Sequence, residues 1–315
     1  MKQHHRYLLP LLALLSLSPP SPAADPAPAS NGAERLLPDK EQERMMALSA
    51  SQPVSTEVLW LETQHESFLG LFQPANQPQP RGGILLLPHD RTSPDWPGAM
   101  QTLRRGLPDK GWHTLAIALP DEPLPILPRF DSASAASDSG AAKGAAPLQD
   151  HFQRIAQRIE VGLNTLRQRG VQKIYLVGEG SGGYWASRYL DEHDEQALYP
   201  ILIDATQPTT PAMPLLQRLT EKQRLPALDL YHGNGLARDP IEQQARLRAD
   251  SAKRAGLPAY LSVRMAPRAG DWRQTDPRLL AVVSGLIERH LEKATQPKAA
   301  PPAAAPSNRR PGRKP

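Results

Sequence analysis

The stretch Lys173-Ile-Tyr-Leu-Val-Gly-Glu-Gly-Ser-Gly-Gly-Tyr-Trp-Ala186 decides how this chain folds. Its first five residues form an apolar run that is typical of a buried strand, and four glycines and one serine follow within six residues. Glycine adopts backbone conformations that other residues avoid, so this composition predicts a sharp turn. The aromatic and small residues after the turn then favour a helix.

Seven more apolar runs flank this segment and alternate with helical patterns. The eight expected strands are Val58–Glu62, Ser67–Phe72, Gly83–Pro88, Trp112–Leu119, Lys173–Val177, Tyr199–Ile203, Ala227–Tyr231 and Tyr260–Met265. The first two read as an antiparallel hairpin, and the continuous apolarity of the others indicates parallel strands buried on both faces. The sequence therefore predicts an α/β fold with a mostly parallel eight-stranded sheet, helices on both faces and a site at the carboxyl ends of the strands.

Two of the intervening segments show a clear helical period. An apolar stripe at steps of three and four predicts a helix that ends at Gly170, and its members are Phe152, Ile155, Ile159, Leu163 and Leu166. Asp276-Pro277 reads as an N-cap followed by proline at the first helical position of the last helix. The buried face of that helix is expected to hold Leu279, Val283, Leu286, Ile287 and Leu291.

The glycine-rich turn resembles the nucleophile elbow of α/β-hydrolases, in which a serine stands on a strand-turn-helix and the next backbone N–H serves the oxyanion hole. The family pattern is an apolar strand, Gly, any residue, Ser, any residue, Gly, Gly. In one register, Gly178, Gly182 and Gly183 match the three glycines. Gly180 then takes the place of the nucleophile, with Ser181 directly after it. Glycine holds the positive-φ conformation of an elbow with little strain.

A second register makes Ser181 the nucleophile. Glu179 then occupies the small-residue position two before it, where its side chain crowds the approach of strand to helix. The first register fits better, because it also keeps the strand within its apolar run. In that register Ser181 is read as an N-terminal helix residue whose hydroxyl bonds nearby backbone N–H groups.

The resemblance also implies where a catalytic histidine belongs, which is the loop before the last helix. There the expected Gly-His is replaced by Gly270-Asp271. An aspartate is a poor base for a serine hydroxyl, because its reference pKa of about 3.9 lies far below neutral pH. Asp271 therefore marks a degenerate histidine position.

Four other polar residues follow strand ends. The acid of the fold follows the run Ala227–Tyr231, where Asn234 lies near the expected place and Asp239 comes later. His232, in the same loop, is read as a loop-packing or surface histidine. His89 follows the strand Gly83–Pro88, where the α/β-hydrolase resemblance implies the other oxyanion-hole donor, so it is a candidate to line a pocket.

The N-terminus predicts export. Lys2 and Arg6 precede an apolar run at Tyr7–Leu17, and small residues follow up to Ala23. This pattern indicates a cleaved signal peptide and a periplasmic protein, since the run is short of the roughly 20 residues of a membrane span. The predicted organisation is a signal peptide at 1–23, a flexible segment at 24–52, a domain at 53–294 with a low-complexity insertion at 131–147, and a disordered basic tail at 295–315.

Composition excludes several classes of function. The chain has no cysteine, so disulfides and thiolate metal sites are ruled out, and we expect neither a metal nor a cofactor. The formal net charge is +5, but the tail contributes five positive charges and the signal peptide two, which leaves the body at −2. Nucleic-acid binding is therefore not expected, because it needs basic residues clustered on a folded face.

Further motifs resemble a known family. They are Pro94-Asp95-Trp96-Pro97, Gly111-Trp112-His113-Thr114-Leu115 and Leu119-Pro120, together with the glycine-rich turn and the Gly270-Asp271-Trp272 loop. Over about Glu57 to Leu291 the chain is similar to the exported α/β-hydrolase-like proteins of Gram-negative bacteria in the domain of unknown function 3530 family. The resemblance implies the α/β-hydrolase fold and periplasmic residence. It supplies no substrate.

Three functions remain open. The first is a pseudo-hydrolase that binds an unknown small molecule or envelope component without a standard triad. The second is a serine esterase with Ser181 as nucleophile, His232 or His89 as base, and Asp239 or Asp204 as acid. The third is an envelope-associated module whose basic tail contacts anionic polymer or lipid.

Overall fold

The computed structural model describes residues 40–121, 140–193, 198–208, 214–222, 226–234, 239–257, 259–267 and 276–291, with only the backbone at 140–148. The predicted signal peptide, Asp271 and the basic tail lie outside these residues. Within the described ranges, no helix combines the length and apolarity that a membrane crossing requires.

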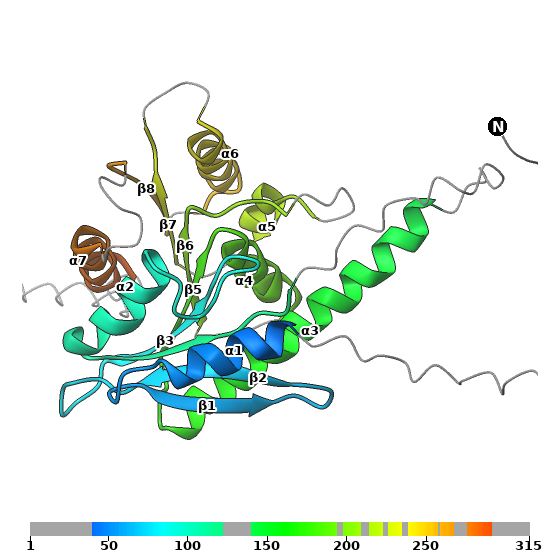
Figure 1. Cartoon of the computed structure of the whole chain (residues 1–315). Coiled ribbons are helices and arrows are strands. Elements are labelled where there is room, and N and C mark those ends of the chain that lie inside the picture. The colour runs from blue at the N-terminus through cyan, green and yellow to red at the C-terminus, as the bar shows by residue number, and fades with distance from the viewer. Residues whose placement is uncertain are drawn as a thin grey trace, which may run out of the picture. The chain divides into compact units, whose positions relative to one another are not determined.

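The centre of the fold is one eight-stranded sheet with the order β1-β2-β4-β3-β5-β6-β7-β8 (Figure 1). Its strands are β1 (Glu57–Glu62), β2 (Ser67–Gln73), β3 (Gly82–Leu87), β4 (Trp112–Ile117), β5 (Ile174–Glu179), β6 (Leu198–Ile203), β7 (Ala227–His232) and β8 (Tyr260–Met265). The strand β2 pairs antiparallel with β1 and with β4, and every other pairing is parallel. The predicted mostly parallel sheet with an antiparallel opening hairpin is therefore confirmed.

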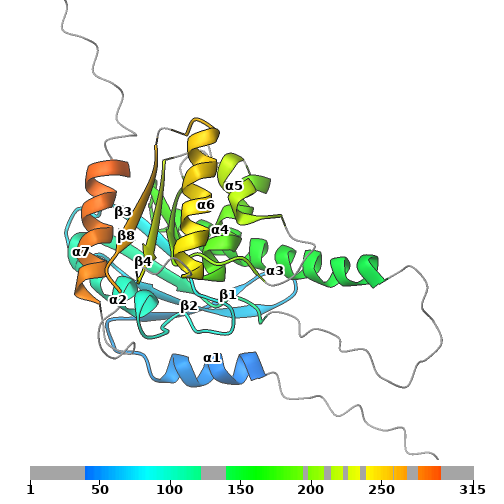
Figure 2. The same ribbon diagram turned by 90° about the horizontal axis from the view of Figure 1, so that it is seen from above.

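Helices cover both faces of this sheet. They are α1 (Lys40–Ala50), α2 (Ala99–Gly106), α3 (Gly140–Gln168), α4 (Ser181–Glu192), α5 (Leu216–Lys222), α6 (Pro240–Arg254) and α7 (Pro277–Leu286), with a 3-10 turn η1 (Leu107–Lys110) and a π-helical turn η2 (Ile287–Leu291). Figure 2 shows α2 and α7 on one side of β3 to β8 and α3 to α6 on the other. Two separate hydrophobic clusters fill these two interfaces.

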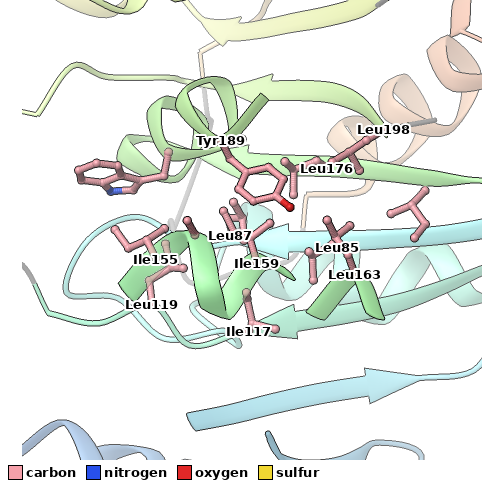
Figure 3. Close-up of a cluster of buried hydrophobic side chains, with 14 of the residues drawn as sticks. Leu85, Leu87, Ile117, Leu119, Ile155, Ile159, Leu163, Leu176, Tyr189 and Leu198 are labelled. Carbon is pink, nitrogen blue, oxygen red and sulfur yellow. The ribbon is translucent and has the colours of Figure 1, made fainter. Parts of the chain in front are cut away.

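The cluster under α3 and α4 confirms the predicted apolar stripe. Figure 3 shows Ile155, Ile159 and Leu163 of α3 next to Leu85 and Leu87 of β3. All five side chains are fully buried. Burial of each such side chain stabilises the fold by about 1.5–3 kcal/mol, so this interface holds α3 and β3 firmly in place below the carboxyl edge of the sheet.

Two helices begin where the sequence predicted flexible chain. Helix α1 lies within the segment 24–52, and its Met45 is buried with Leu69 and Leu71 of β2. Helix α3 begins at Gly140, inside the low-complexity insertion 131–147, where alanines favour helix. In α1 the decisive contacts are long-range, and a local reading of composition does not reveal them.

Candidate functional site

The turn between β5 and α4 has the geometry of an elbow. Gly180 is its tip, with φ 57° and ψ −123°, and Ser181 is the first residue of α4. A Cβ on Gly178 would lie 2.4 Å from the backbone of Gly182 and Gly183, and a Cβ on Gly182 would lie 2.3 Å from the carbonyl oxygen of Leu87. These glycines therefore let the helix approach the strand ends closely.

Backbone hydrogen bonds fix the tip against the end of β6. The N–H of Gly180 donates to the carbonyl of Ile203 at 2.9 Å, and the N–H of Thr206 donates to the carbonyl of Gly180 at 3.0 Å. The N–H of Asp204 in turn donates to the carbonyl of Leu230 on β7 at 2.9 Å. The carboxyl ends of β5, β6 and β7 are thus joined into one rigid edge.

The imidazole of His89 fills the space beside the tip. A Cβ built on Gly180 would lie only 2.5 Å from Nδ1 of His89. The backbone N–H of Ser181 donates to the same nitrogen at 3.0 Å, so Nδ1 is an acceptor and the ring proton of a neutral His89 lies on Nε2. The N–H that follows the tip, which in an elbow is an oxyanion-hole donor, is therefore already occupied.

The hydroxyl of Ser181 also has polar contacts. Its Oγ lies 3.0 Å from Nδ1 of His89 and accepts the backbone N–H of Asp90 at 2.8 Å. The indole N–H of Trp185, one turn along α4, donates to Oδ1 of Asp90 at 3.2 Å. With Ser181 only 2 % exposed, its hydroxyl ties the loop after β3 to α4.

A second polar pair lies at the ends of β6 and β7. Oδ2 of Asp204 is 2.8 Å from Nδ1 of His232, and Oδ1 accepts the backbone N–H of His232 at 2.7 Å. Asp204 has φ 46°, a conformation that costs a non-glycine residue about 1–3 kcal/mol and often marks a functional site. Among the four acid–base combinations considered from the sequence, the structure brings together His232 and Asp204.

Asp239 performs a different task in the structure. Its Oδ1 accepts the N–H groups of Ile241 and Glu242 at 3.0 and 3.2 Å, and its Oδ2 accepts the N–H of Asn234 at 3.1 Å. The donors from Asn234, Glu242 and Ile241 lower the pKa of Asp239. Asp239 is therefore the N-cap of α6, and among the hydrogen bonds of the described residues none joins it to His232 or Ser181.

The family follows from a direct comparison. Residues 6–289 match the family described as "Protein of unknown function (DUF3530)". The chain belongs to this family. None of the curated proteins matches this DUF3530 chain.

Solved structures similar to this DUF3530 protein share its fold at low identity. A putative dienelactone hydrolase from Klebsiella pneumoniae is 12 % identical with a TM-score of 0.52, covering 76 % of this chain and 98 % of its own. A Pyrococcus furiosus esterase is 12 % identical with a TM-score of 0.51, covering 75 % and 91 %. Est1E from Butyrivibrio proteoclasticus is 10 % identical with a TM-score of 0.50, covering 76 % and 99 %. These likenesses establish the α/β-hydrolase fold of the DUF3530 chain.

One buried histidine near the elbow of this DUF3530 protein was not singled out from the sequence. His151 on α3 is 2 % exposed and meets the Trp185 ring edge-on, with centroids 5.4 Å apart. Burial lowers its pKa to about 4, and neither ring nitrogen has a hydrogen-bond partner among the described residues. The sequence did hold one indication that His151 is buried, because it lies four residues before Ile155 and therefore on the same apolar stripe of the helix.

Proposed function

We propose that this protein is a periplasmic pseudo-hydrolase, a domain that keeps the α/β-hydrolase fold as a binding or scaffold unit without a serine nucleophile. Its ligand would be a small molecule or an envelope component that meets the carboxyl edge of the sheet. The proposal rests on one observation above all, which is the occupation of the elbow.

The tip of the elbow has no side-chain oxygen. Gly180 is there, and Nδ1 of His89 lies 2.5 Å from the position of a Cβ at this residue. An acyl group at this point would meet neither a nucleophile nor a free N–H from Ser181, because that N–H donates to His89. Nucleophilic catalysis requires both a positioned nucleophile and donors for the developing oxyanion.

The contact between Ser181 and His89 is the one feature that favours a serine esterase instead. Their separation of 3.0 Å is within reach for a proton transfer from Oγ to Nδ1. However, Oγ is buried and accepts the N–H of Asp90, so attack on an external carbonyl would first require this bond to break. If the alternative held, the esterases that share this fold would make an ester the expected substrate.

We expect the purified mature protein to show no labelling by fluorophosphonate probes and no turnover of simple esters that depends on Ser181. The physical reason is that the Ser181 hydroxyl is buried and its oxygen accepts the backbone N–H of Asp90. Labelling is measured on the wild type, on Ser181→Ala and on Ser187→Ala, a buried serine of the same helix whose Oγ donates to the carbonyl of Gly183. Labelling lost in Ser181→Ala but kept in Ser187→Ala would make this protein an enzyme.

Periplasmic residence has its own test. We expect cleavage after Ala23, with Ala24 as the alternative, because signal peptidase requires small residues at the last position before the cut and the third before it. The intact mass of the exported protein gives the new N-terminus. A mature protein that retains Leu8 to Leu17 would instead be an anchored one.

A further inference from the structure

The strand β1 forms one edge of the sheet, and among the strands that the structure describes it pairs with β2 alone (Figure 1). An open edge is a template for another strand, and proteins protect it with charged residues, proline or a covering segment. The opposite edge strand, β8, carries the exposed Arg264. By contrast, the middle of β1 is apolar, and its charged residues Glu57 and Glu62 lie at its two ends. Trp60, in that middle part, is 43 % exposed, so β1 is the less protected edge.

The backbone groups of β1 point alternately to β2 and to the open edge, and two hydrogen bonds show which do which. The N–H of Thr63 donates to the carbonyl of Glu66, the residue opposite it, at 2.9 Å. The carbonyl of Leu69, which lies opposite Trp60, instead accepts the N–H of Ala118 at 2.8 Å on the β4 side. Residues that exchange hydrogen bonds with their opposite partner alternate with residues that do not. The residues of β1 whose N–H and C=O groups point to the open edge are therefore Val58, Trp60 and Glu62.

This alternation restricts how a second copy of β1 can pair with the first. In an antiparallel pair of identical strands, the residues with outward backbone groups must lie opposite one another, since these residues form the new bonds. The register that pairs the whole strand then has Trp60 opposite Trp60 of the other copy, and Val58 opposite Glu62. Glu57 cannot lie opposite Glu62, because the backbone groups of Glu57 point to β2. The pairing therefore brings no carboxylate directly opposite another.

The side chains that this register brings together are complementary on both faces of the strand. On one face the two copies of Trp60 meet at the two-fold axis, and aromatic pairs across strands are stabilising. On the other face Leu59 lies opposite Leu61 of the other copy. Both leucines pack against the cluster under α3, so this apolar row continues from one sheet into the next. A shift of the register by two residues would separate the two copies of Trp60 and leave fewer residues paired.

We propose that β1 is a dimerisation strand, which pairs antiparallel with β1 of a second copy of this chain and joins the two sheets into one. A contact of this kind uses the same surface on both copies, so it closes on itself and gives a dimer instead of a fibre. The edge of one short strand offers a small interface, and the dimer is therefore weak and depends on concentration. The elbow takes no part in this contact, so the inference goes beyond the proposed function and does not depend on it.

The first test is sedimentation velocity of the mature full-length protein from micromolar to submillimolar concentration. We expect the wild type to shift from monomer to dimer as the concentration rises. Trp60→Lys places two like charges opposite each other at the axis, so this variant should stay a monomer over the same range. Leu247→Lys also replaces an exposed apolar residue, but it lies on α6, which packs on β7 and β8 at the other end of the sheet. It should dimerise as the wild type does.

The second test measures the register. The chain has no cysteine, so a single introduced cysteine has no competitor. Opposite residues of a hydrogen-bonded antiparallel pair have Cα atoms about 5.5 Å apart, which is within the range of a disulfide. Trp60→Cys should therefore form a disulfide-linked dimer under mild oxidation. Glu62→Cys, on the same exposed edge, should not, because its counterpart lies about 13 Å farther along the strand.

Three results overturn the inference. A wild type that stays a monomer over the whole range would leave the edge to a strand of a different protein or to residues outside the described ranges. A dimer that persists in Trp60→Lys would be formed by another surface. Disulfide-linked dimers that form equally from Trp60→Cys and Glu62→Cys would indicate random collision in place of the expected register. None of these results bears on the nucleophile, since the labelling of Ser181 is a separate measurement.

Discussion

Replacing Arg248 with methionine is expected to lower the free energy of unfolding by about 3–5 kcal/mol, because it leaves a buried carboxylate without its counter-charge. Arg248 of α6 and Asp229 of β7 have side chains 1 % and 0 % exposed. Nε and Nη2 of Arg248 donate to the two oxygens of Asp229 at 2.8 and 2.9 Å, and the Tyr260 hydroxyl donates to Oδ2 at 2.6 Å. Burial opposes the charge on Arg248, but Asp229 outweighs it and raises the pKa of the guanidinium.

The substitution of Arg248 should also disturb the pair of Asp204 and His232. Nη1 of Arg248 donates to the carbonyl of Ala205 at 3.1 Å, and Ala205 follows Asp204 directly. We therefore expect the NMR resonances of the His232 ring to shift in Arg248→Met even where the protein remains folded. Urea unfolding measures the stability change, and an unchanged dependence on urea shows that the two-state transition is intact.

Two further variants separate charge from packing. Arg218→Met, on α5, removes an i,i+3 pair with Glu221 in which the two side chains are 70 % and 27 % exposed, and it should cost less than about 1 kcal/mol. The double variant Arg248→Met with Asp229→Leu removes both charges and should recover part of the loss. A cost for Arg248→Met no larger than that for Arg218→Met would contradict the structure at this point.

Replacing His151 with phenylalanine is expected to have the opposite sign and to raise the free energy of unfolding at neutral pH by about 1–3 kcal/mol. The change removes two buried nitrogens that have no hydrogen-bond partner among the described residues, and it keeps an aromatic ring against Trp185. His151→Leu tests the same point with a smaller side chain that avoids overpacking. His65→Phe, on an exposed turn, should change the stability little.

The same histidine predicts a pH dependence. Burial lowers the pKa of His151 from 6.5 to about 4, so between these values the unfolded chain binds a proton that the folded protein does not. Stability is therefore lost as the pH falls from about 6.5 to 4, by about 3 kcal/mol from this one group. In His151→Phe this part of the slope should vanish. Equal slopes for wild type and variant in denaturation at pH 7 and pH 4.5 would show that the ring is not a buried neutral imidazole.

The sheet could be predicted from the sequence because its evidence is local. Each strand of a buried parallel sheet is a continuous apolar run that can be recognised in the sequence. The strand expected at Ala227–Tyr231, for example, extends over Ala227–His232 in the structure. Helix α1 could not be predicted in this way. Its Met45 packs on β2, and its Glu41 bonds Arg158 more than a hundred residues away, so long-range contacts stabilise it.

The candidate site was predictable only in part, for a related reason. The glycines of the elbow lie close together in the sequence, and their spacing predicts the turn. By contrast, the bond between Asp204 and His232 joins the ends of two strands, and the contact of His89 with Ser181 spans 92 positions. Such pairings depend on side-chain directions at the edge of the sheet, which residue spacing does not specify.

The imidazole of His89 occupies the space that a side chain at position 180 would need, and this limits which substitutions the elbow can accept in evolution. Mutation of Gly180 to serine would bring a Cβ to within 2.5 Å of Nδ1 of His89, so it is harmful while the histidine remains. Loss of His89 alone removes the acceptor for the N–H of Ser181, which is harmful as well. Each single step toward a serine nucleophile is therefore opposed by the other residue. A lineage that carries this pair is expected to keep it, because gaining a serine at position 180 requires two substitutions at once.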